Sequence, residues 1–485
     1  MQSLMPVLAV LGGILMVFAA TMLLPLGFAF FGGDAALAAY DGAIVITFAV
    51  GLVLFLVCRR YKRELQPRDG FLLVSLVWTV LPAFGALPLM FHLQGLSFTD
   101  AYFEAVSGLT TTGATVLTGL DQLPTSINVW RCFMVLIGGM GILVLAVAIL
   151  PLLGVGGSQL FKAETPGPMK DQKLTPRIAE TARGLWTVYF AIALACFLAF
   201  RAAGMGWADA FMHMCSTMGL GGFAAYDASF AQFQSPAIEA VAIVFMLIAG
   251  VNFALYFVAW KRRSLIGVWR DVETRTFLLT MLTSVLGIAA FLTAHGVYPS
   301  FAESLRHTAF NVVSIATTTG FASVDYAQWP IFAPVLMLFL CCFATCAGST
   351  GGGIKMVRAL ILVKGARREL KRIVHPRSVV PVKLGGTVVG SDVLQSVLAF
   401  MLFYGAVMVG ATMLLLFTGL DVVSAFTAIV ACINNTGPGL GQVGPSGNYQ
   451  GLTDFQTWVC SITMLLGRLE LFSILVLFTA SFWRK

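Results

Sequence analysis

Ten apolar segments limit what this 485-residue chain can fold into more than any other feature of its sequence. A helix that spans a bilayer needs about 20 predominantly apolar residues, and each segment is long enough. The segments cover residues 4–32, 40–58, 70–91, 128–153, 184–204, 236–260, 274–296, 331–362, 392–418 and 456–482. We therefore expect an all-α membrane protein with ten transmembrane helices.

Composition supports this expectation. Hydrophobic residues make up 58% of the chain and charged residues only 11%, whereas a soluble domain carries about 25% charged residues. So few charges cannot cover a water-facing surface, so most of the chain must face lipid. The net charge of +8 is not a nucleic-acid signature, because the basic residues form short clusters between apolar segments.

The basic clusters also predict an orientation. They follow the second, fourth, sixth and eighth spans and end the chain. The clusters are Arg59 to Arg63, Lys162 to Arg183, Lys261 to Arg263, Lys364 to Arg377 and Trp483-Arg484-Lys485. All of them fall on one side of a ten-span protein, which the positive-inside rule makes cytoplasmic. We expect a multi-pass protein with both termini in the cytoplasm.

Enzyme and metal-centre motifs are missing from the sequence. The nine cysteines lie mostly in apolar stretches without metal-ligand spacing to histidine, which is typical of small core residues. There is no His-Glu-x-x-His motif, no nucleophile elbow and no pair of intramembrane carboxylates. We expect no enzymatic activity.

Four of the predicted outer gaps share one pattern. Each begins with an acidic or small residue suited to a helix N-cap, continues as an apolar half-helix of about three turns, and reaches a glycine turn. The turns read Thr110-Thr-Thr-Gly113, Gly219-Leu-Gly-Gly222, Ala316-Thr-Thr-Thr-Gly320 and Ile433-Asn-Asn-Thr-Gly437. The last glycines are 109, 98 and 117 residues apart.

This spacing predicts a unit of span, half-helix, glycine loop and span that occurs four times after a leading helix pair. The predicted divisions are an N-terminal helix pair at 1–64 and pore repeats at 65–160, 161–265, 266–377 and 378–485. The third repeat includes an intramembrane loop. Four units that each cross the membrane twice indicate pseudo-fourfold symmetry around one axis.

The glycine loops point to ion conduction. Non-helical backbone is tolerated at membrane depth where it lines a water-filled path or is buried in protein. Backbone carbonyls can replace the hydration shell of a cation, and glycine permits the unusual dihedrals that this requires. The half-helices would turn their partially negative C-terminal ends toward the ion. One Thr-Thr-Thr-Gly also fits an ordinary capped helix end, but four copies in register favour a pore.

The eighth segment is interrupted by a glycine-rich stretch, Ala347-Gly-Ser-Thr-Gly-Gly-Gly-Ile-Lys355. A phosphate-binding loop needs Gly-Lys followed by Ser or Thr, and Ile354 separates the last glycine from Lys355. A plain helix kink is one interpretation. We favour a flexible intramembrane loop below the filter, because Gly351 to Gly353 would break a helix inside lipid unless the backbone lined the cavity.

Arg468, in the last predicted span, is the second unusual intramembrane residue. A central arginine costs about 2.5–3.5 kcal/mol on insertion scales, so it should face a polar interior or a partner. One alternative is an internal ion pair, with Glu470 or another acid. The other is a positive charge near the pathway that limits the passage of cations. We expect four weaker candidates to be structural or vestibule residues: Arg201, His213, Glu104 and Arg306.

The spans and glycine loops resemble a superfamily of potassium transporters that comprises bacterial Trk and Ktr membrane subunits, fungal Trk proteins and plant high-affinity transporters. The resemblance covers essentially the whole chain, and the extra helix pair at 4–58 resembles the TrkH branch. It implies gated, channel-like potassium uptake across the bacterial inner membrane. It also implies a homodimer with one pore per subunit and a cytosolic, nucleotide-binding regulatory ring of the TrkA type. Membrane lipids are the other expected partners.

The resemblance assigns site residues. The filter glycines are Gly113, Gly222, Gly320 and Gly437, and the coordinating carbonyls precede them on Thr111, Thr112, Leu220, Gly221, Thr318, Thr319, Asn435 and Thr436. The fourth loop departs furthest from the Thr-Thr-Gly pattern. Some sodium-selective plant members have serine at the first glycine, so Gly113 favours potassium. The gate would comprise Gly348, Ser349, Thr350, Gly351, Gly352, Gly353 and Arg468.

A proton- or sodium-coupled secondary transporter is the main alternative. Coupling normally requires titratable acids inside the spans, and these are scarce here, with Glu470 as the main exception. We expect K⁺ as the transported ion and no organic cofactor in this subunit.

Overall fold

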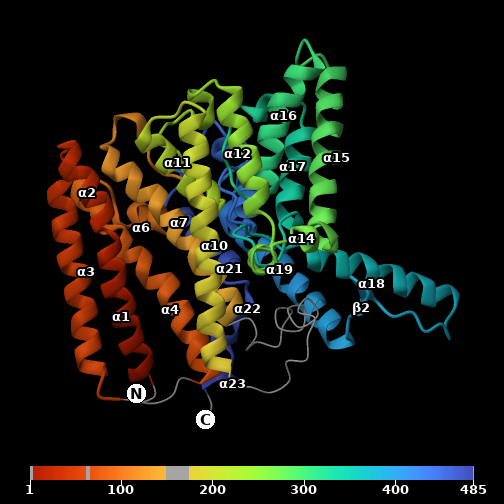
Figure 1. Cartoon of the computed structure of the whole chain (residues 1–485), viewed down its shortest axis with the longest axis horizontal. Coiled ribbons are helices and arrows are strands. Elements are labelled where there is room, and N and C mark those ends of the chain that lie inside the picture. Colours follow the sequence, from red (N-terminus) through yellow and green to blue (C-terminus); the bar gives the residue numbers. More distant parts are fainter. Residues whose placement is uncertain (1–3, 62–65, 149–173, 484–485) are drawn as a thin grey trace.

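The computed structural model describes residues 4–61, 66–148 and 174–483 (Figure 1). The described residues form a helical bundle with one short two-stranded hairpin, so the all-α prediction is confirmed. Parts of three predicted basic clusters lie outside the described residues, at 62–63, 162–173 and 484–485. The end of the fourth predicted span, at 149–153, and the predicted repeat boundaries at 64 and 160 also lie outside them.

The N-terminal part packs along one side of the bundle, in red and orange in Figure 1. Its helices are α1 (Met5–Thr21), α2 (Leu23–Gly32), α3 (Leu37–Cys58), α4 (Pro67–Gly85) and α5 (Leu87–His92). Helices α1 and α3 approach closely through two glycines, since a Cβ atom at Gly12 would lie 2.6 Å from the carbonyl oxygen of Gly51. Small residues at a helix crossing allow this close packing within a membrane.

Four short helices match the predicted half-helices. They are α6 (Phe98–Leu109), α11 (Trp207–Gly219), α16 (Phe301–Ala316) and α20 (Val422–Ile433). A short 3₁₀ turn begins 8–11 residues after the end of each helix. These turns are η1 (Leu120–Gln122), η2 (Ser229–Gln232), η3 (Tyr326–Gln328) and η4 (Gly441–Val443). The same local sequence of elements therefore occurs four times in the described chain.

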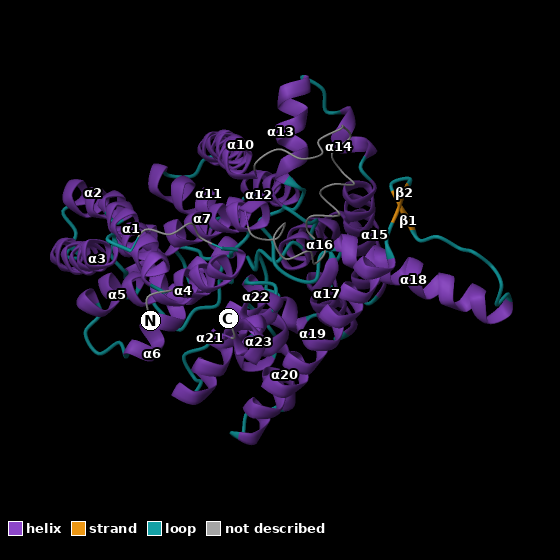
Figure 2. Cartoon of the chain, turned by 90° about the horizontal axis from the view of Figure 1, so that it is seen from below, coloured by secondary structure: helices purple, strands orange, loops and turns teal. Residues whose placement is uncertain are grey.

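The remaining elements surround these short helices. They are α7 (Thr125–Ala148), α10 (Leu174–Ala202), α12 (Pro236–Ala249), α13 (Phe253–Arg262), α14 (Ile266–Arg270), α15 (Val272–Ala294), α17 (Phe332–Phe343), α18 (Met356–Val374), β1 (Lys383–Leu384), β2 (Thr387–Val388), α19 (Ser391–Phe417), α21 (Asp454–Arg468), α22 (Phe472–Leu475), η5 (Val476–Phe478) and α23 (Ala480–Trp483). Helix α18 projects from the body of the bundle beside the hairpin (Figures 1 and 2).

Seven helices in the described residues are long and apolar enough to cross a membrane. They span Met5–Gly32, Leu37–Cys58, Arg68–His92, Thr125–Leu143, Thr181–Ala202, Val272–Ala294 and Ser391–Phe417. The pair α12 and α13 would make an eighth span, although it bends by 88°. A total of ten spans stays a prediction, because the eighth and tenth predicted segments are divided into shorter helices.

Two predicted spans break at a polar cap or at a backbone turn. The segment at 236–260 breaks after Ala249, where Asn252 caps the new helix α13 by accepting a hydrogen bond from Ala254 N. The segment at 456–482 breaks after Arg468, where Glu470 and Leu471 both have positive φ. Apolar content predicts how long a segment is but not where a polar cap or a backbone turn interrupts it.

The eighth predicted segment is interrupted as its glycines indicated. Helix α17 ends at Phe343, α18 begins at Met356, and residues 344–355 between them are not helical. We call residues 344–355 the intramembrane loop. The hairpin β1–β2 after α18 was not predicted, although its Gly385-Gly386 turn, with φ of 56° and 89°, is a common two-residue hairpin signal.

The non-helical segments gather in the middle of the bundle. Figure 2 shows loops at the centre with helices around them. The short helices α6, α11 and α20 are buried along most of their length, which places them inside the protein rather than against lipid. The start of α1 and helix α23 lie at the same end of the bundle (Figure 1).

Candidate functional site

The site is built from the segments that follow the four short helices. We call them the ring loops: loop 1 (110–119), loop 2 (220–228), loop 3 (317–325) and loop 4 (434–440). Side-chain oxygens of Ser97, Ser300 and Asp421 cap the N-termini of α6, α16 and α20. Such caps satisfy backbone N–H groups and define where each helix starts.

All four helices end in the same hydrogen-bonded turn. In each, an N–H just beyond the C-cap (two residues beyond in α6, α16 and α20, one residue beyond in α11) bonds a carbonyl five residues back, as in the Schellman arrangement. The bonds join Thr112 N to Ser107 O, Gly221 N to Ser216 O, Thr319 N to Ser314 O and Thr436 N to Ala431 O, at 2.8–3.0 Å. The four loops therefore leave their helices in the same way.

The backbone after this turn also repeats. The first left-handed residue in each loop is not glycine, and a glycine with positive φ follows two positions later. The pairs are Thr111 and Gly113 (φ 55° and 80°), Leu220 and Gly222 (53° and 61°), Thr318 and Gly320 (62° and 89°), and Asn435 and Gly437 (53° and 94°). Loop 4 has the same register as the others, despite its different sequence.

Positive φ at threonine and leucine is unusual. A left-handed residue other than glycine costs about 1–2 kcal/mol, and surrounding structure must hold it in place. Here Thr111, Leu220 and Thr318 are fully buried. Strain of this kind concentrates at ligand-binding sites. The sequence directed attention to the glycines, whereas the structure adds these strained positions.

The ring loops contact one another in a closed cycle. Each glycine faces a carbonyl of the next loop at a distance that leaves no room for a side chain. A Cβ atom at Gly113 would lie 2.3 Å from Gly221 O, one at Gly222 2.2 Å from Thr319 O, one at Gly320 2.1 Å from Thr436 O, and one at Gly437 2.6 Å from Thr112 O. Loop 1 meets loop 2, loop 2 meets loop 3, loop 3 meets loop 4, and loop 4 returns to loop 1.

Most of the predicted carbonyl oxygens are free of protein donors. Among the described residues, no hydrogen bond reaches the carbonyls of Thr111, Thr112, Leu220, Thr318, Thr319, Asn435 or Thr436. Gly221 is the exception, because its oxygen accepts from Phe223 N at 2.8 Å. Buried carbonyls normally have a partner, so this set of oxygens is suited to a ligand that accepts their lone pairs.

Several loop side chains bond one another, whereas the buried hydroxyls of Thr111 and Thr436 have no hydrogen-bond partner among the described residues. The hydroxyls of Thr110 and Thr112 lie 2.7 Å apart, and those of Thr317 and Thr319 lie 2.8 Å apart. Asn435 Nδ2 donates to Thr112 Oγ1 at 3.0 Å, which joins loop 4 to loop 1. These contacts orient the side chains of Thr110, Thr112, Thr317, Thr319 and Asn435.

The intramembrane loop lies against the ends of three of the short helices. Thr350 Oγ1 donates to Met218 O near the end of α11 at 2.9 Å, and Gly352 N donates to Thr318 Oγ1 in loop 3 at 2.8 Å. A Cβ atom at Gly352 would lie 2.0 Å from Asn434 O in loop 4. The structure therefore brings the predicted gate glycines together with the ring loops.

Both ends of the intramembrane loop bond one carboxylate. Glu273 Oε1, on α15, accepts from Ala347 N at 2.8 Å and from Val357 N at 3.0 Å. At the downstream end, Lys355 Nζ donates to Gly351 O, and Lys355 itself has a φ of 78°. The sequence analysis did not single out Glu273; its signal was an acid at the start of an apolar span.

Arg468 connects the intramembrane loop to helix α7. Its side chain is 2% exposed, and it donates to Thr350 O at 2.9 Å and to Gly138 O on α7 at 3.2 Å. The predicted alternative of an ion pair with Glu470 is wrong, since Glu470 pairs with Arg358. Arg468 contacts backbone carbonyls instead, and its Nε has no hydrogen-bond partner among the described residues.

The weaker candidates have structural contacts. Glu104 pairs with Arg131, and Arg306 with Glu239. His213 Nδ1 lies 2.8 Å from Asp209 O. No cluster of three or more histidine, cysteine or acidic side chains suited to a metal ion occurs among the residues that the structure describes.

Comparisons with known proteins give a consistent result. The family model named TrkH, described as a cation transport protein, matches residues 39–485. The chain is 46% identical over 477 residues to the Trk system potassium uptake protein TrkH of Salmonella typhimurium, covering 98% of each chain. It is 38% identical to the Trk system potassium uptake protein TrkG of Escherichia coli, covering 98% of this chain and 97% of that protein.

A solved structure has the same fold. The crystal structure of the potassium transporter TrkH from Vibrio parahaemolyticus matches with a TM-score of 0.92 and 42% sequence identity. The match covers all of this chain and 99% of the other.

Proposed function

Because this chain belongs to the TrkH family of cation transport proteins, we propose that it takes up potassium ions through a backbone-carbonyl filter formed by the four ring loops. The closed cycle of glycine–carbonyl contacts is the observation that carries this proposal. A family of transporters, rather than of enzymes, agrees with the lack of catalytic motifs in the sequence.

The filter would work by replacing water around the ion. A dehydrated cation needs several oxygens at once, and rings of carbonyls supply them without a formal charge. The unbonded oxygens on Thr112, Thr319 and Thr436 belong to three successive loops of the cycle. The C-terminal ends of four short helices add partial negative charge at the same place, which stabilises a cation and repels an anion.

Gly113 is the position on which we base a preference for potassium over sodium. A serine there would bring its Cβ 2.3 Å from Gly221 O, at a φ of 80°. Loops 1 and 2 would have to move apart, and their carbonyls would no longer keep the spacing that glycine permits. Some sodium-selective plant members of the superfamily that the sequence resembles carry serine at this position, where this chain has glycine. This difference supports the same conclusion.

We assign the gate to the intramembrane loop and Arg468. The loop contacts α11, loop 3 and loop 4. A displacement of the loop would break these contacts beside the ring. Arg468 adds a positive charge bonded to the loop at Thr350 O. At about 6 Å and an effective dielectric constant of about 20, its repulsion of a cation would be roughly 3 kcal/mol. That is sufficient to limit the rate of passage.

A proton- or sodium-coupled transporter is less well supported. Coupling needs an acid that can change its partner during transport. Glu104, Glu239 and Glu470 each pair with an arginine, and Glu273 binds two backbone N–H groups. The buried acids are thus already engaged in contacts that hold helices together.

The proposal extends to location and partners. We place the protein in the bacterial inner membrane, with both termini and the basic clusters in the cytoplasm. We further propose a homodimer with one pore per subunit, regulated by a TrkA-like nucleotide-binding ring. The name "Trk system", which the similar proteins carry, supports a system of several components. The basic residues of α18 are suited to contact such a ring.

The test is ion flux into proteoliposomes with Rb⁺ as the potassium tracer and Na⁺ as the competitor. Wild type should pass Rb⁺ in preference to Na⁺ without an imposed proton gradient. Gly113→Ser should lower the Rb⁺/Na⁺ flux ratio at least tenfold. Gly119→Ser is the matched control, because Gly119 also has positive φ, 66°, but no atom lies within 4 Å of its added Cβ.

Two outcomes would contradict the proposal. If Gly119→Ser lowers the ratio as much as Gly113→Ser, backbone strain alone explains the effect and the filter assignment fails. If uptake requires a proton gradient, the coupled-transporter alternative replaces the channel-like mechanism.

A further inference from the structure

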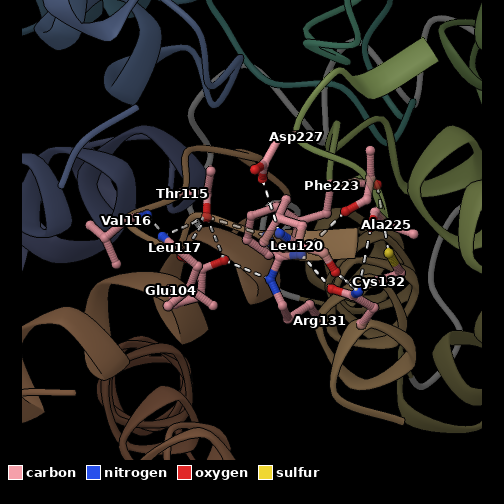
Figure 3. Close-up of polar contacts among 12 residues, drawn as sticks. Glu104, Thr115, Val116, Leu117, Leu120, Arg131, Cys132, Phe223, Ala225 and Asp227 are labelled. Atoms are coloured by element: carbon pink, nitrogen blue, oxygen red, sulfur yellow. Dashed lines mark hydrogen bonds and ion pairs between the residues drawn. The ribbon is translucent and has the colours of Figure 1, made fainter. Parts of the chain in front are cut away.

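A fully buried ion pair lies beside the ring, between loops 1 and 2. Glu104 is on α6 and Arg131 is on α7, and Arg131 Nε lies 2.8 Å from Glu104 Oε1 (Figure 3). Neither side chain has exposed surface. Burying two charges is expensive unless each is paired and hydrogen-bonded, so the remaining contacts of the pair explain why it is tolerated.

Glu104 binds the part of loop 1 that follows Gly113. Its carboxylate accepts from Thr115 Oγ1 at 3.0 Å and from Val116 N at 3.1 Å. Thr115 in turn accepts from Leu117 N at 3.1 Å and from Arg131 Nη2 at 3.3 Å. Loop 1 is therefore held against its own helix from the second residue beyond the glycine.

Arg131 extends the same network to loop 2. Its Nη1 donates to Ala224 O at 3.2 Å, and its guanidinium carbon lies 4.4 Å from the centre of the Phe223 ring. Both residues follow Gly222 directly. The other Nη1 bond, 3.0 Å to Asn128 Oδ1, orients the guanidinium. One arginine thus touches the backbone of loop 2 and the acid that holds loop 1.

Neighbouring groups on α7 and loop 2 add further hydrogen bonds between loops 1 and 2 and α7. Asn128 Nδ2 donates to Leu120 O at 2.6 Å, and Cys132 Sγ donates to Phe223 O at 3.6 Å. Asp227, in loop 2, accepts from the N–H groups of Gly119 and Leu120 at 2.8 and 3.1 Å. Figure 3 shows these groups converging between the two loops.

The other three loops have simpler arrangements at the corresponding position. The residue nine positions before the ring glycine is Glu104 in loop 1, and His213, Asn311 and Ala428 in the others. Asn311 Oδ1 accepts from Ser323 N at 3.2 Å, within its own loop. Just after loop 2, Phe230 N donates to Ala322 O in loop 3 at 3.0 Å, and Ala322 N donates to Ser229 Oγ at 3.3 Å. Among the described residues, a charged pair joins adjacent ring loops only between loops 1 and 2.

An ion pair of this kind contributes little to stability compared with apolar side chains of the same volume. What apolar side chains cannot do is bond Val116 N and Ala224 O at fixed distances and directions. Buried polar networks can specify one conformation among several that are similarly stable. Binding sites need such support, since their first contacts keep their geometry only if neighbouring groups hold them.

We propose that Glu104 and Arg131 are positioning residues that set the spacing of loops 1 and 2, and through it the discrimination between potassium and sodium. This inference rests on the proposed function, because it assigns the selectivity of the filter in part to side chains that do not face the ion. It predicts that loss of the pair lowers selectivity more than it lowers assembly.

The experiment compares Rb⁺ and Na⁺ flux in proteoliposomes for wild type and four variants of the full chain. Arg131→Met removes the contacts of Arg131 with Ala224 O and the Phe223 ring in loop 2, and the double variant Glu104→Leu with Arg131→Met replaces the whole pair by apolar groups. Arg131→Lys keeps the charge but not the branched set of donors. Arg306→Met is the matched control, because Arg306 pairs with Glu239 at 2.7 Å but contacts neither loop 1 nor loop 2.

The expected result is an Rb⁺/Na⁺ ratio at least tenfold lower in Arg131→Met and in the double variant, a smaller loss in Arg131→Lys, and no change in Arg306→Met. Elution as a monodisperse peak in detergent shows which variants assemble. If Arg131→Met does not assemble, the double variant decides the question. If neither assembles, the pair is only structural and the inference is overturned.

Two further outcomes separate the inference from the proposed function. A wild type that passes neither ion contradicts the proposed function, and the inference falls with it. A selective wild type with an equally selective Arg131→Met contradicts the inference alone. An equal loss in Arg306→Met also overturns it, because any ion pair on a short helix would then have the same effect.

Discussion

The ring loops and the intramembrane loop are both non-helical backbone in the middle of a helical bundle, yet they are held in different ways. The ring closes by direct contact between backbones, with the projected Cβ atoms of its glycines 2.1–2.6 Å from the facing carbonyls. The intramembrane loop has one such contact, at Gly352, whose projected Cβ lies 2.0 Å from Asn434 O, but it is otherwise held by separate hydrogen bonds, including those of the Thr350, Glu273 and Arg468 side chains.

The difference indicates which region can move. Close-packed backbone changes position only if its neighbours move with it, because packed interiors are rigid. A loop held mainly by separate hydrogen bonds can be released when those bonds break, each worth about 0.5–1.5 kcal/mol, or more when charged. We therefore expect changes in the ring to alter selectivity or abolish flux, and changes in the intramembrane loop to alter rate.

The largest effect is expected in the ring, from Gly320→Ala. The new Cβ would lie 2.1 Å from Thr436 O and would have a φ of 89°, so loops 3 and 4 cannot keep their contact. Rb⁺ flux should fall at least about 100-fold, measured in proteoliposomes. Gly296→Ala is the matched control, with a φ of 68° and no atom within 4 Å of its Cβ. Normal flux in Gly320→Ala would show that the ring adjusts more than its packing indicates.

The second-largest effect is expected at Arg468, which contacts the intramembrane loop. Arg468→Ala removes the bonds to Thr350 O and Gly138 O together with the charge. Rb⁺ flux should rise about tenfold, which corresponds to an activation barrier lower by roughly 1.4 kcal/mol. The Rb⁺/Na⁺ flux ratio should stay unchanged. Arg201→Ala is the control, since Arg201 also donates to a backbone carbonyl, Met205 O. A changed ion ratio would mean that the two regions are not separable.

A smaller effect is expected from Glu273→Ala. This change frees the N–H groups of Ala347 and Val357, at the two ends of the intramembrane loop, without changing the contacts of Arg468. Flux should rise about threefold, and amide hydrogen exchange of residues 344–357 should become faster. The ring loops serve as an internal control, because their exchange should not change. Equal acceleration in the ring would contradict the division into rigid and releasable regions.

The smallest effect is expected at the outer end of a short helix, far from both loops. Asp421 accepts from Ser424 N at 3.0 Å, and this bond lowers the pKa of its carboxyl group. Asp421→Ala should cost about 1 kcal/mol of stability, seen as a small decrease in Tm, with an unchanged ion ratio. Asp421→Asn keeps a capping oxygen but not the charge, so at neutral pH it should lose less stability than Asp421→Ala.

The lowered pKa also predicts a pH dependence for this cap. A depressed folded-state pKa stabilises the protein at neutral pH, and that contribution is lost as the pH falls below 3.8, the ordinary value, through the folded-state pKa. The Tm difference between wild type and Asp421→Asn should therefore shrink as the pH falls through that range. A difference that stays constant would mean that the carboxylate charge contributes nothing to the cap.

The sequence predicted the helical class, the four short helices and the position of their glycines. Apolar length, cap residues and glycine spacing carry that information, because all three act locally. It did not predict that Thr111, Leu220 and Thr318 would have positive φ. Those conformations depend on contacts between loops roughly 100 residues apart, and local preference opposes them.

The pairing partners of the buried charged side chains could not be predicted from the sequence either. Glu470 was a reasonable partner for Arg468, two positions away, but it pairs with Arg358 on another helix. Glu104 was treated as a minor candidate and Arg131 was not singled out. An arginine early in an apolar span was the available signal. The partner of Arg131 was not predictable, since pairing across helices depends on their rotation.

The order in which the ring closes has a consequence for synthesis. Loop 1 and loop 4 meet through Asn435 and Thr112, which are 323 residues apart. At 5–20 residues per second, the ribosome makes loop 4 roughly 15–65 s after loop 1. Until then one side of the ring is open, and a nascent chain contains only part of the oxygen set. The complete ring therefore forms last.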